Sequence, residues 1–227
     1  CVDDGSTDAT PRILAEAASE HPDWLRLLPL RANGGKGAAV AAGFASARGE
    51  FLLFLDSDLA YAPDQTLKVL AALEDGADVA IACRVLDESR FVMSPNFFRY
   101  LYTRHLMGRF FNLLVRSLVV PGLLDTQAGL KGFRRPAAQR LFKLRTLDRF
   151  SFDVEILFIA QRLGLRISQV PVEFRYFHED STVRFVRDTV AMLADLARIR
   201  MNGARGRYEA PVEPVSASTG IGVRAGS

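Results

Sequence analysis

The feature that most constrains the fold is the apolar run Phe51-Leu52-Leu53-Phe54-Leu55, which is followed at once by Asp56-Ser57-Asp58. Because successive side chains of a strand point to opposite faces, a run without polar alternation predicts a central strand covered on both faces. Strands of this kind are typical of α/β sheets, whose ligands bind beyond the carboxyl ends of the strands. The run therefore indicates both a fold class and a place for a site.

Other segments repeat this alternation of strands and helices. Apolar runs predict strands at residues 25–30, 78–82 and 167–176, the last one broken at Pro171, and residues 125–133 are expected to return to the sheet. Helical patterns lie between them: one begins at Pro11, and the others cover residues 38–47, 63–73, 136–142, 152–163 and 183–199. This rhythm predicts an α/β sheet with much parallel pairing.

Composition limits the class of protein. The 227 residues are 49% hydrophobic and 24% charged, which excludes disordered, collagen-like and coiled-coil chains. A formal net charge of +3 is too mild a bias to make nucleic acid an expected partner. Cys1 and Cys83 are the only cysteines, so a cytoplasmic location is expected. No apolar stretch reaches the roughly 18 residues that span a bilayer, so a soluble or peripheral protein is expected.

Two acidic clusters are candidates for a site. The first is Asp3-Asp4-Gly5-Ser6-Thr7-Asp8, whose side chains alternatively serve only as turn and cap residues. The second is Asp56-Ser57-Asp58, whose carboxylates repel each other unless a cation or a donor compensates them. Mg²⁺ or Mn²⁺ is the natural partner, because such ions bind carboxylate oxygens and keep positions for water and phosphates. The alternative is a capping Asp58 beside a solvated Asp56.

The glycine-rich segment Asn33-Gly34-Gly35-Lys36-Gly37 precedes a predicted helix. It is not a P-loop, since Gly37 stands where that motif requires Ser or Thr. A glycine-rich turn that opens a helix can still approach a phosphate or a ribose, with Lys36 as a point charge.

Together, these segments resemble the inverting family 2 glycosyltransferases with a GT-A fold. The matching pieces are the first acidic cluster, the glycine-rich segment and the DxD motif at residues 56–58. Within that family, the chain is most similar to the dolichyl-phosphate or polyprenyl-phosphate β-glucosyltransferase branch. This narrower resemblance is carried by Asp125-Thr126-Gln127-Ala128-Gly129-Leu130-Lys131-Gly132-Phe133, Phe152-Asp153-Val154-Glu155, Val170-Pro171-Val172 and residues 187–196.

The resemblance implies an α/β fold of the GT-A nucleotide-diphospho-sugar transferase type, with a mixed, mostly parallel central sheet flanked by helices. Because Cys1-Val2 runs directly into the first acidic cluster, we expect the N-terminal strand and helix to be missing. The expected organisation is a glycosyltransferase domain over residues 1–178, a C-terminal amphipathic helix over 179–201 and a disordered tail over 202–227.

The resemblance also implies a donor site for UDP-glucose. Its donor-binding residues would be Asp3, Asp4, Ser6, Lys36, Asp56 and Ser57, with Asp4 accepting a hydrogen bond from the uracil ring. Asp56 and Asp58 would hold Mg²⁺ or Mn²⁺ against the diphosphate, and Asp58 would be catalytic because the metal stabilises the departing UDP.

The acceptor would be a dolichyl or polyprenyl phosphate. A lipid phosphate is already ionised at neutral pH, so no strong general base is required. Positioning of the acceptor would then be the work of the remaining catalytic candidates, Asp125, Gln127, Asp153 and Glu155. The acceptor phosphate would contact Lys131, Arg134 and Arg135; the alternative is that this basic turn before a helix is plain surface. The branch usually has Ser-Lys-Val where this chain has Ser181-Thr182-Val183, so His178 or Arg184 would supply the absent cation.

The segment from Arg99 to Leu124 interleaves aromatic and basic residues, which is typical of an interfacial helix on an anionic membrane. The alternative is a helix that packs on the core and turns its arginines to water. With the cytoplasmic expectation, this predicts peripheral attachment to the cytoplasmic face of a membrane.

Three other functions are open on sequence grounds. The nearest is another family 2 transferase, with a different donor such as GDP-mannose or with a glycan hydroxyl as acceptor. A signalling receiver domain also places acidic residues after strands, but it has no part that corresponds to residues 124–176. A nucleotide-sugar binding module without turnover is the third.

Overall fold

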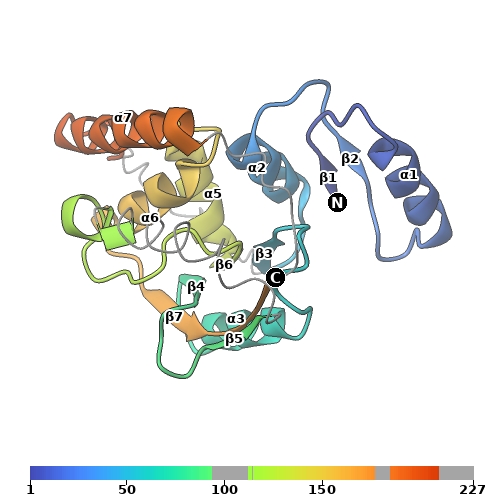
Figure 1. Cartoon of the computed structure of the whole chain (residues 1–227), viewed down its shortest axis with the longest axis horizontal. Coiled ribbons are helices and arrows are strands. Elements are labelled where there is room, and N and C mark those ends of the chain that lie inside the picture. The colour runs from blue at the N-terminus through green and yellow to red at the C-terminus, as the bar shows by residue number, and fades with distance from the viewer. Residues whose placement is uncertain (94–111, 114, 177–184, 210–227) are drawn as a thin grey trace, which may run out of the picture.

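The computed structural model describes residues 1–93, 112–113, 115–176 and 185–209 (Figure 1). The elements run in the order β1 (Val2–Asp3), α1 (Thr10–Glu20), β2 (Leu28–Pro29), α2 (Lys36–Ser46), β3 (Phe51–Leu55), α3 (Gln65–Glu74), β4 (Val79–Cys83), β5 (Arg90–Met93), β6 (Leu130–Arg134), α5 (Arg135–Leu144), α6 (Phe152–Arg162), β7 (Ile167–Pro171), β8 (Glu173–Tyr176) and α7 (Phe185–Ala204).

The main sheet has four strands in the order β3-β6-β4-β7. Strand β6 is antiparallel to both β3 and β4, whereas β4 and β7 are parallel, so β3, β4 and β7 all point the same way. The sheet is therefore mixed, and β6 separates two strands that a purely parallel arrangement would pair. The carboxyl ends of β3, β4 and β7 meet at one edge, where β6 begins.

Both faces of this sheet are covered, since alternate side chains of β3 pack against helices on opposite sides. Leu52 and Phe54 join the core on the side of α5 and α6, whereas Phe51 and Leu53 pack with the residues of α3. In Figure 1, α3 lies on one side of the sheet and α2, α5 and α6 lie on the other. The prediction of a strand covered on both faces is confirmed, but β3 is the outer strand of the four and not a central one.

Two small parallel pairs complete the described strands. β1 pairs with β2, and β5 pairs with β8. β5 was not predicted, since its short sequence has no periodicity and its partner lies more than 80 residues away. The predicted break at Pro171 is confirmed: β7 ends at this residue, which cannot donate to a ladder, and β8 begins at Glu173.

Helix α7 packs outside α6 as a third layer (Figure 1). Helix α7 runs to Ala204 and so includes Asn202, which is 4% exposed; beyond the helix, Tyr208 is 1% exposed. A tail that begins at residue 202 is therefore wrong: Gly203 and Tyr208 pack against Phe158 of α6, whose ring a Cβ on Gly203 would meet at 2.7 Å. Residues 210–227 lie outside the described residues. Within the described parts, none of the helices is both long and apolar enough to cross a membrane.

Candidate functional site

The first acidic cluster and the glycine-rich loop form one unit. Both carboxylate oxygens of Asp4 accept backbone N–H groups, one from Gly34 and one from Gly35, each at 2.8 Å. Asp3 accepts hydrogen bonds from the backbone and the hydroxyl of Ser6, which fixes the turn between them. In the structure, Asp4 holds the loop that leads into α2, and Asp3 supports the turn at Ser6.

The DxD motif lies at the carboxyl edge of the main sheet, directly after β3. The backbone N–H of Asp56 donates to the carbonyl of Gly129 at 2.9 Å, which ties the motif to the residues that precede β6. A Cβ on Gly129 would lie 2.4 Å from Asp56 Oδ2, so only glycine leaves room for this carboxylate.

After Asp56 the chain turns sharply. Ser57 is exposed, and Leu59 has a φ of +56°, the one positive φ among the described non-glycine residues. Asp58 Oδ1 accepts the N–H of Ala60 at 3.0 Å, which leaves Oδ2 at a half-exposed position. Asp58 therefore does cap the turn, as in the alternative interpretation, but only one of its two carboxylate oxygens is used for this.

Asp56 and three other charged side chains, each from a different part of the chain, lie next to one another. Lys36 Nζ lies 2.9 Å from Asp56 Oδ2 and 3.4 Å from Asp153 Oδ2, and Lys131 Nζ lies 2.7 Å from Asp153 Oδ1. We call this row, Lys131-Asp153-Lys36-Asp56, the charge row. Lys36 begins α2, Asp153 belongs to the first turn of α6 and Lys131 to β6. The signs alternate along the row, so each inner charge is held between two opposite ones.

Burial makes this row electrostatically strong. Burial raises the pKa of the Asp56 carboxyl, and the Lys36 charge opposes that rise. Burial acts to lower the pKa of Lys36, but Asp153 and Asp56 outweigh it and the pKa is raised. For Lys131, which is 1% exposed, burial lowers the pKa despite the neighbouring Asp153. The aromatic ring of Phe54 lies 5.5 Å from both ammonium groups and contributes cation–π attraction.

Arg84 is a site residue that the sequence analysis missed. It follows β4 directly, and its Nε and Nη2 donate to both oxygens of Asp125 at 2.6 and 2.9 Å. Burial acts to raise the pKa of Asp125, but the Arg84 charge and hydrogen bonds outweigh it and lower that pKa. The rule that led to Asp56, a polar residue just after a buried strand, also applies to Arg84.

Two buried hydroxyls accompany this pair. Among the described residues, neither Tyr61 Oη nor Thr126 Oγ1 has a hydrogen-bond partner, although both side chains are almost fully buried. Burial raises the pKa of Tyr61, and both Arg84 and Asp125 act on it electrostatically. Gln127 follows on the same loop and is half-buried. Arg84, Asp125 and Asp56 thus lie at one edge of the sheet.

Glu155 is not part of the site. Its carboxylate accepts hydrogen bonds from the backbone of Thr146 and Leu147, from the Thr146 hydroxyl and from the Tyr208 hydroxyl. The prediction that it positions the acceptor is wrong, because these partners bind it on the side of α7.

Two of the predicted phosphate contacts are also wrong. Lys131 is enclosed by Asp153 and by the carbonyl of Ala128, to which it donates at 2.7 Å. Arg134 lies at the far end of β6, opposite the first residue of β3, and donates to the carbonyls of Leu73 and Ala77. Because β6 runs antiparallel, Arg134 is at the edge of the sheet away from the DxD motif. His178, Arg184 and most of residues 99–124 lie outside the described residues.

The donor set at the DxD motif fits a divalent cation. The described residues contain no group of three or more His, Cys, Asp or Glu side chains that would hold a metal by themselves. Mg²⁺ is often bound through one or two carboxylates and completes its shell with water and substrate phosphates. Asp56 and Asp58 are two such carboxylates one residue apart.

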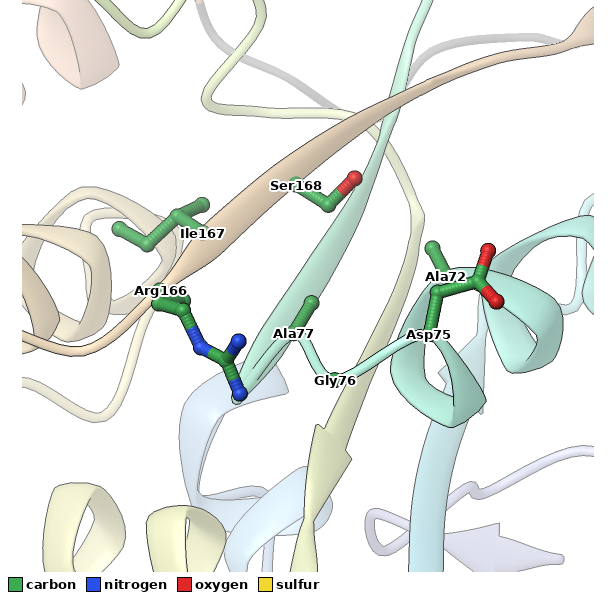
Figure 2. A pocket seen from close by; sticks show the side chains of 7 residues that line it. All are labelled: Ala72, Asp75, Gly76, Ala77, Arg166, Ile167 and Ser168. Carbon is green, nitrogen blue, oxygen red and sulfur yellow. The ribbon is translucent and has the colours of Figure 1, made fainter.

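A hollow of about 330 Å³ lies at the opposite edge of the sheet, where β4 and β7 begin (Figure 2). Arg166 and Asp75 stand on different sides of it, and Gly76 lies between them with a φ of +101°. Its charged groups do not converge, in contrast to those at the DxD edge.

Residues 1–142 match the profile described as glycosyl transferase family 2. This chain belongs to that family. The chain is 32% identical over 211 residues to the dolichyl-phosphate beta-glucosyltransferase of Dictyostelium discoideum, and 34% identical over 214 residues to the human protein of that name. The two matches cover 92% and 91% of this chain but only 64% of each relative, so the chain spans less than two thirds of their length.

Solved structures of the glycosyltransferase type share the fold. Glucosyl-3-phosphoglycerate synthase from Mycobacterium tuberculosis in complex with UDP aligns with a TM-score of 0.59 at 21% identity, over 93% of this chain and 69% of that one. The same enzyme with Mn²⁺, UDP-glucose and phosphoglyceric acid aligns with a TM-score of 0.55 at 21% identity. The predicted GT-A fold, a mixed and mostly parallel sheet flanked by helices, is confirmed, and a receiver domain is excluded.

Proposed function

We propose that this protein is an inverting, metal-assisted transferase that moves glucose from UDP-glucose to a dolichyl or polyprenyl phosphate. The observation that carries the proposal is the convergence of Asp56, Asp58, Lys36 and the Arg84–Asp125 pair at one sheet edge of a family 2 chain. The names of the relatives supply the donor sugar and the acceptor class.

In this proposal, Asp58 and Asp56 hold Mg²⁺ or Mn²⁺. The ion would supply positive charge against the diphosphate of the donor. The chain's own contribution is to fix both carboxylates, through the Asp56–Gly129 backbone bond and the turn at Leu59. Solved structures of the same fold contain UDP together with Mg²⁺ or Mn²⁺, which supports this assignment.

The reaction needs a nucleophile and a leaving group. An oxygen of the lipid phosphate forms a bond to C1 of glucose while the bond from C1 to the UDP oxygen breaks, and UDP departs with the electron pair. Attack from the face opposite UDP converts an α-linked donor to a β-linked product. Because the phosphate is already ionised at neutral pH, the site has to orient it rather than deprotonate it.

The Arg84–Asp125 pair supports this orienting role. Asp125 fixes the guanidinium of Arg84 through hydrogen bonds from Nε and Nη2. The Arg84 side chain is 30% exposed, so part of it is accessible to a ligand at this edge. A guanidinium held in this way suits an anionic oxygen. The unpartnered hydroxyl of Thr126 lies on the same loop.

We further propose that the protein works at the cytoplasmic face of a membrane, where a polyprenyl acceptor is embedded. Leu113 and Leu118 are 57% and 52% exposed, and Leu193 of α7 is 43% exposed. Arg116 and Arg200 lie within the same two segments, which suits an anionic lipid surface.

The test is an assay of the full-length protein with Mn²⁺, a short polyprenyl phosphate and a panel of UDP- and GDP-sugars. UDP release that depends on the lipid phosphate and is greatest with UDP-glucose supports the proposal. Transfer from GDP-mannose, or to a glycan hydroxyl instead of the lipid phosphate, would replace it with the neighbouring family 2 reaction. Binding without turnover would indicate a nucleotide-sugar binding module.

A further inference from the structure

The charge row does more than neutralise buried groups, because it ends on a carboxylate of the metal site. Asp56, a candidate carboxylate for a divalent cation, already has Lys36 Nζ at 2.9 Å from its Oδ2. The same ammonium lies 3.4 Å from Asp153 Oδ2. Lys36 therefore stands between two carboxylates, of which only one belongs to the metal site.

We propose that Lys36 is a movable counter-ion that occupies Asp56 in the absence of metal and is retained by Asp153 when a cation binds. This proposal rests on the proposed function, since it requires a metal ion on the DxD carboxylates. Asp153 and Lys131 become positioning residues of the donor site rather than acceptor contacts.

The geometry of Asp153 supports the retaining role. It is 3% exposed, so its charge is poorly screened, and it lies in the first turn of α6, where the helix dipole stabilises an anion. Lys131 is held on two sides, by Asp153 Oδ1 and the Ala128 carbonyl, each at 2.7 Å. Asp153 therefore keeps its position while Lys36 shifts between its partners.

The surroundings of Lys36 permit such a shift. Its side chain is 21% exposed, and its neighbours include the rings of Phe54 and Phe152, at 5.5 and 5.9 Å from the ammonium, and the charge of Lys131 on the far side of Asp153. Aromatic faces attract a cation without fixing its position by a hydrogen bond. With a cation on Asp56, the ammonium of Lys36 would be repelled towards Asp153, which lies 3.4 Å away.

The proposal predicts opposite effects from two substitutions. Lys36→Gln removes the competitor for Asp56, so Mn²⁺ alone should bind about fivefold more tightly, the value of one partly exposed ion pair. The same variant should bind UDP in the presence of Mn²⁺ about fivefold more weakly, because a charge near the diphosphate is lost. Asp153→Asn should weaken the binding of Mn²⁺ alone roughly threefold, because Lys36 then has only Asp56 as its partner.

The experiment measures Mn²⁺ binding by electron paramagnetic resonance and UDP binding by calorimetry, for each variant and for the double variant. Because Asp153 acts through Lys36, most of the effect of Asp153→Asn should vanish in the Lys36→Gln background. Lys68→Gln, on the exposed surface of α3, is the matched control with the same change of charge. Thermal unfolding of each variant shows that the fold is retained.

Two results overturn the proposal. If Lys36→Gln leaves the affinity for Mn²⁺ unchanged or lowers it, Lys36 does not compete for Asp56. If Asp153→Asn weakens Mn²⁺ binding equally in both backgrounds, its role is structural. Failure of the proposed function would look different. The wild type would then bind no UDP in a Mn²⁺-dependent manner, or Asp58→Asn would leave that binding intact, and the proposal about Lys36 would be overturned together with the proposed function.

Discussion

Asp153 and Glu155 lie two residues apart in α6, both are buried, and both are acidic, yet they belong to different parts of the molecule. Asp153 contacts Lys36 and Lys131 at the donor edge. Glu155 contacts the turn after α5 and Tyr208 near the C-terminal end of the described chain. Each residue of a helix advances by about 100°. Two side chains that are two residues apart therefore point to opposite sides of the helix.

Burial and residue type therefore do not distinguish a site residue from a structural one, whereas the groups that contact its carboxylate do. Asp153 is bound by the ammonium groups of Lys36 and Lys131, and Lys36 also contacts Asp56 of the DxD motif. Glu155 is bound by the backbone N–H groups of Thr146 and Leu147 and by two hydroxyls, none of which belongs to the DxD edge. We therefore expect changes near Asp153 to reduce activity and changes near Glu155 to reduce stability.

The largest effect is expected from Asp58→Asn, at the functional side of this comparison. The change removes one carboxylate charge from the metal site, so turnover should fall by at least about 100-fold. The free energy of unfolding should change little, because the amide oxygen can still accept the Ala60 N–H. Steady-state UDP release and urea unfolding measure the two quantities, and near wild-type turnover with Mg²⁺ would show that the metal assignment is wrong.

Gly129→Ala should also reduce activity strongly. The added methyl group would lie 2.4 Å from Asp56 Oδ2, so the carboxylate has to move. A misplacement of about 1 Å at a reacting centre can cost about 100-fold in rate. Gly164→Ala is a control for adding a methyl group without a clash, since its Cβ would meet nothing within 4 Å, although Gly164, unlike Gly129, has a positive φ of +67°. Equal turnover of Gly129→Ala and wild type would refute the tight fit of Asp56.

Glu155→Leu tests the structural side. It leaves the backbone N–H groups of Thr146 and Leu147 and the Tyr208 hydroxyl without their acceptor, so the free energy of unfolding should fall by about 3 kcal/mol. Turnover per folded molecule should stay near the wild-type value at a temperature where the variant is folded. A specific loss of turnover, with unchanged stability, would return Glu155 to the site.

Tyr208→Phe is the mildest test of the same network. It removes one hydrogen bond, the 2.7 Å contact to Glu155, together with an acceptor for Asn202. We expect a loss of about 1 kcal/mol in the free energy of unfolding and no change in the KM for UDP-glucose. A shift in KM would mean that the C-terminal residues reach the donor site.

Much of the fold and one edge of the site were predictable. The apolar run at residues 51–55, the acidic residues after it and the glycine-rich loop are local signals, and the structure brings all three together. The insertion of β6 between β3 and β4 was not predictable, because strand order depends on contacts between distant segments. For the same reason, Lys131 and Arg134 were predicted to contact phosphate although one is buried and the other lies at the far edge.

The membership of Arg84 and the exclusion of Glu155 illustrate the same limit. Both depend on partners that are distant in sequence, Asp125 for Arg84 and Tyr208 for Glu155. The burial of Asn202, Gly203 and Tyr208 was missed because the glycine and polar composition of this segment is typical of a tail, whereas the Tyr208 hydroxyl donates to Glu155.

The most direct test of the account is to identify the product by mass spectrometry. Full-length protein would be incubated with Mn²⁺, UDP-glucose and a short polyprenyl phosphate, beside the Asp58→Asn variant. The account predicts a polyprenyl phosphate that carries one β-linked glucose, formed by the wild type and absent from the variant. A wild-type protein that hydrolyses or only binds UDP-glucose, with no glucolipid formed, would contradict it.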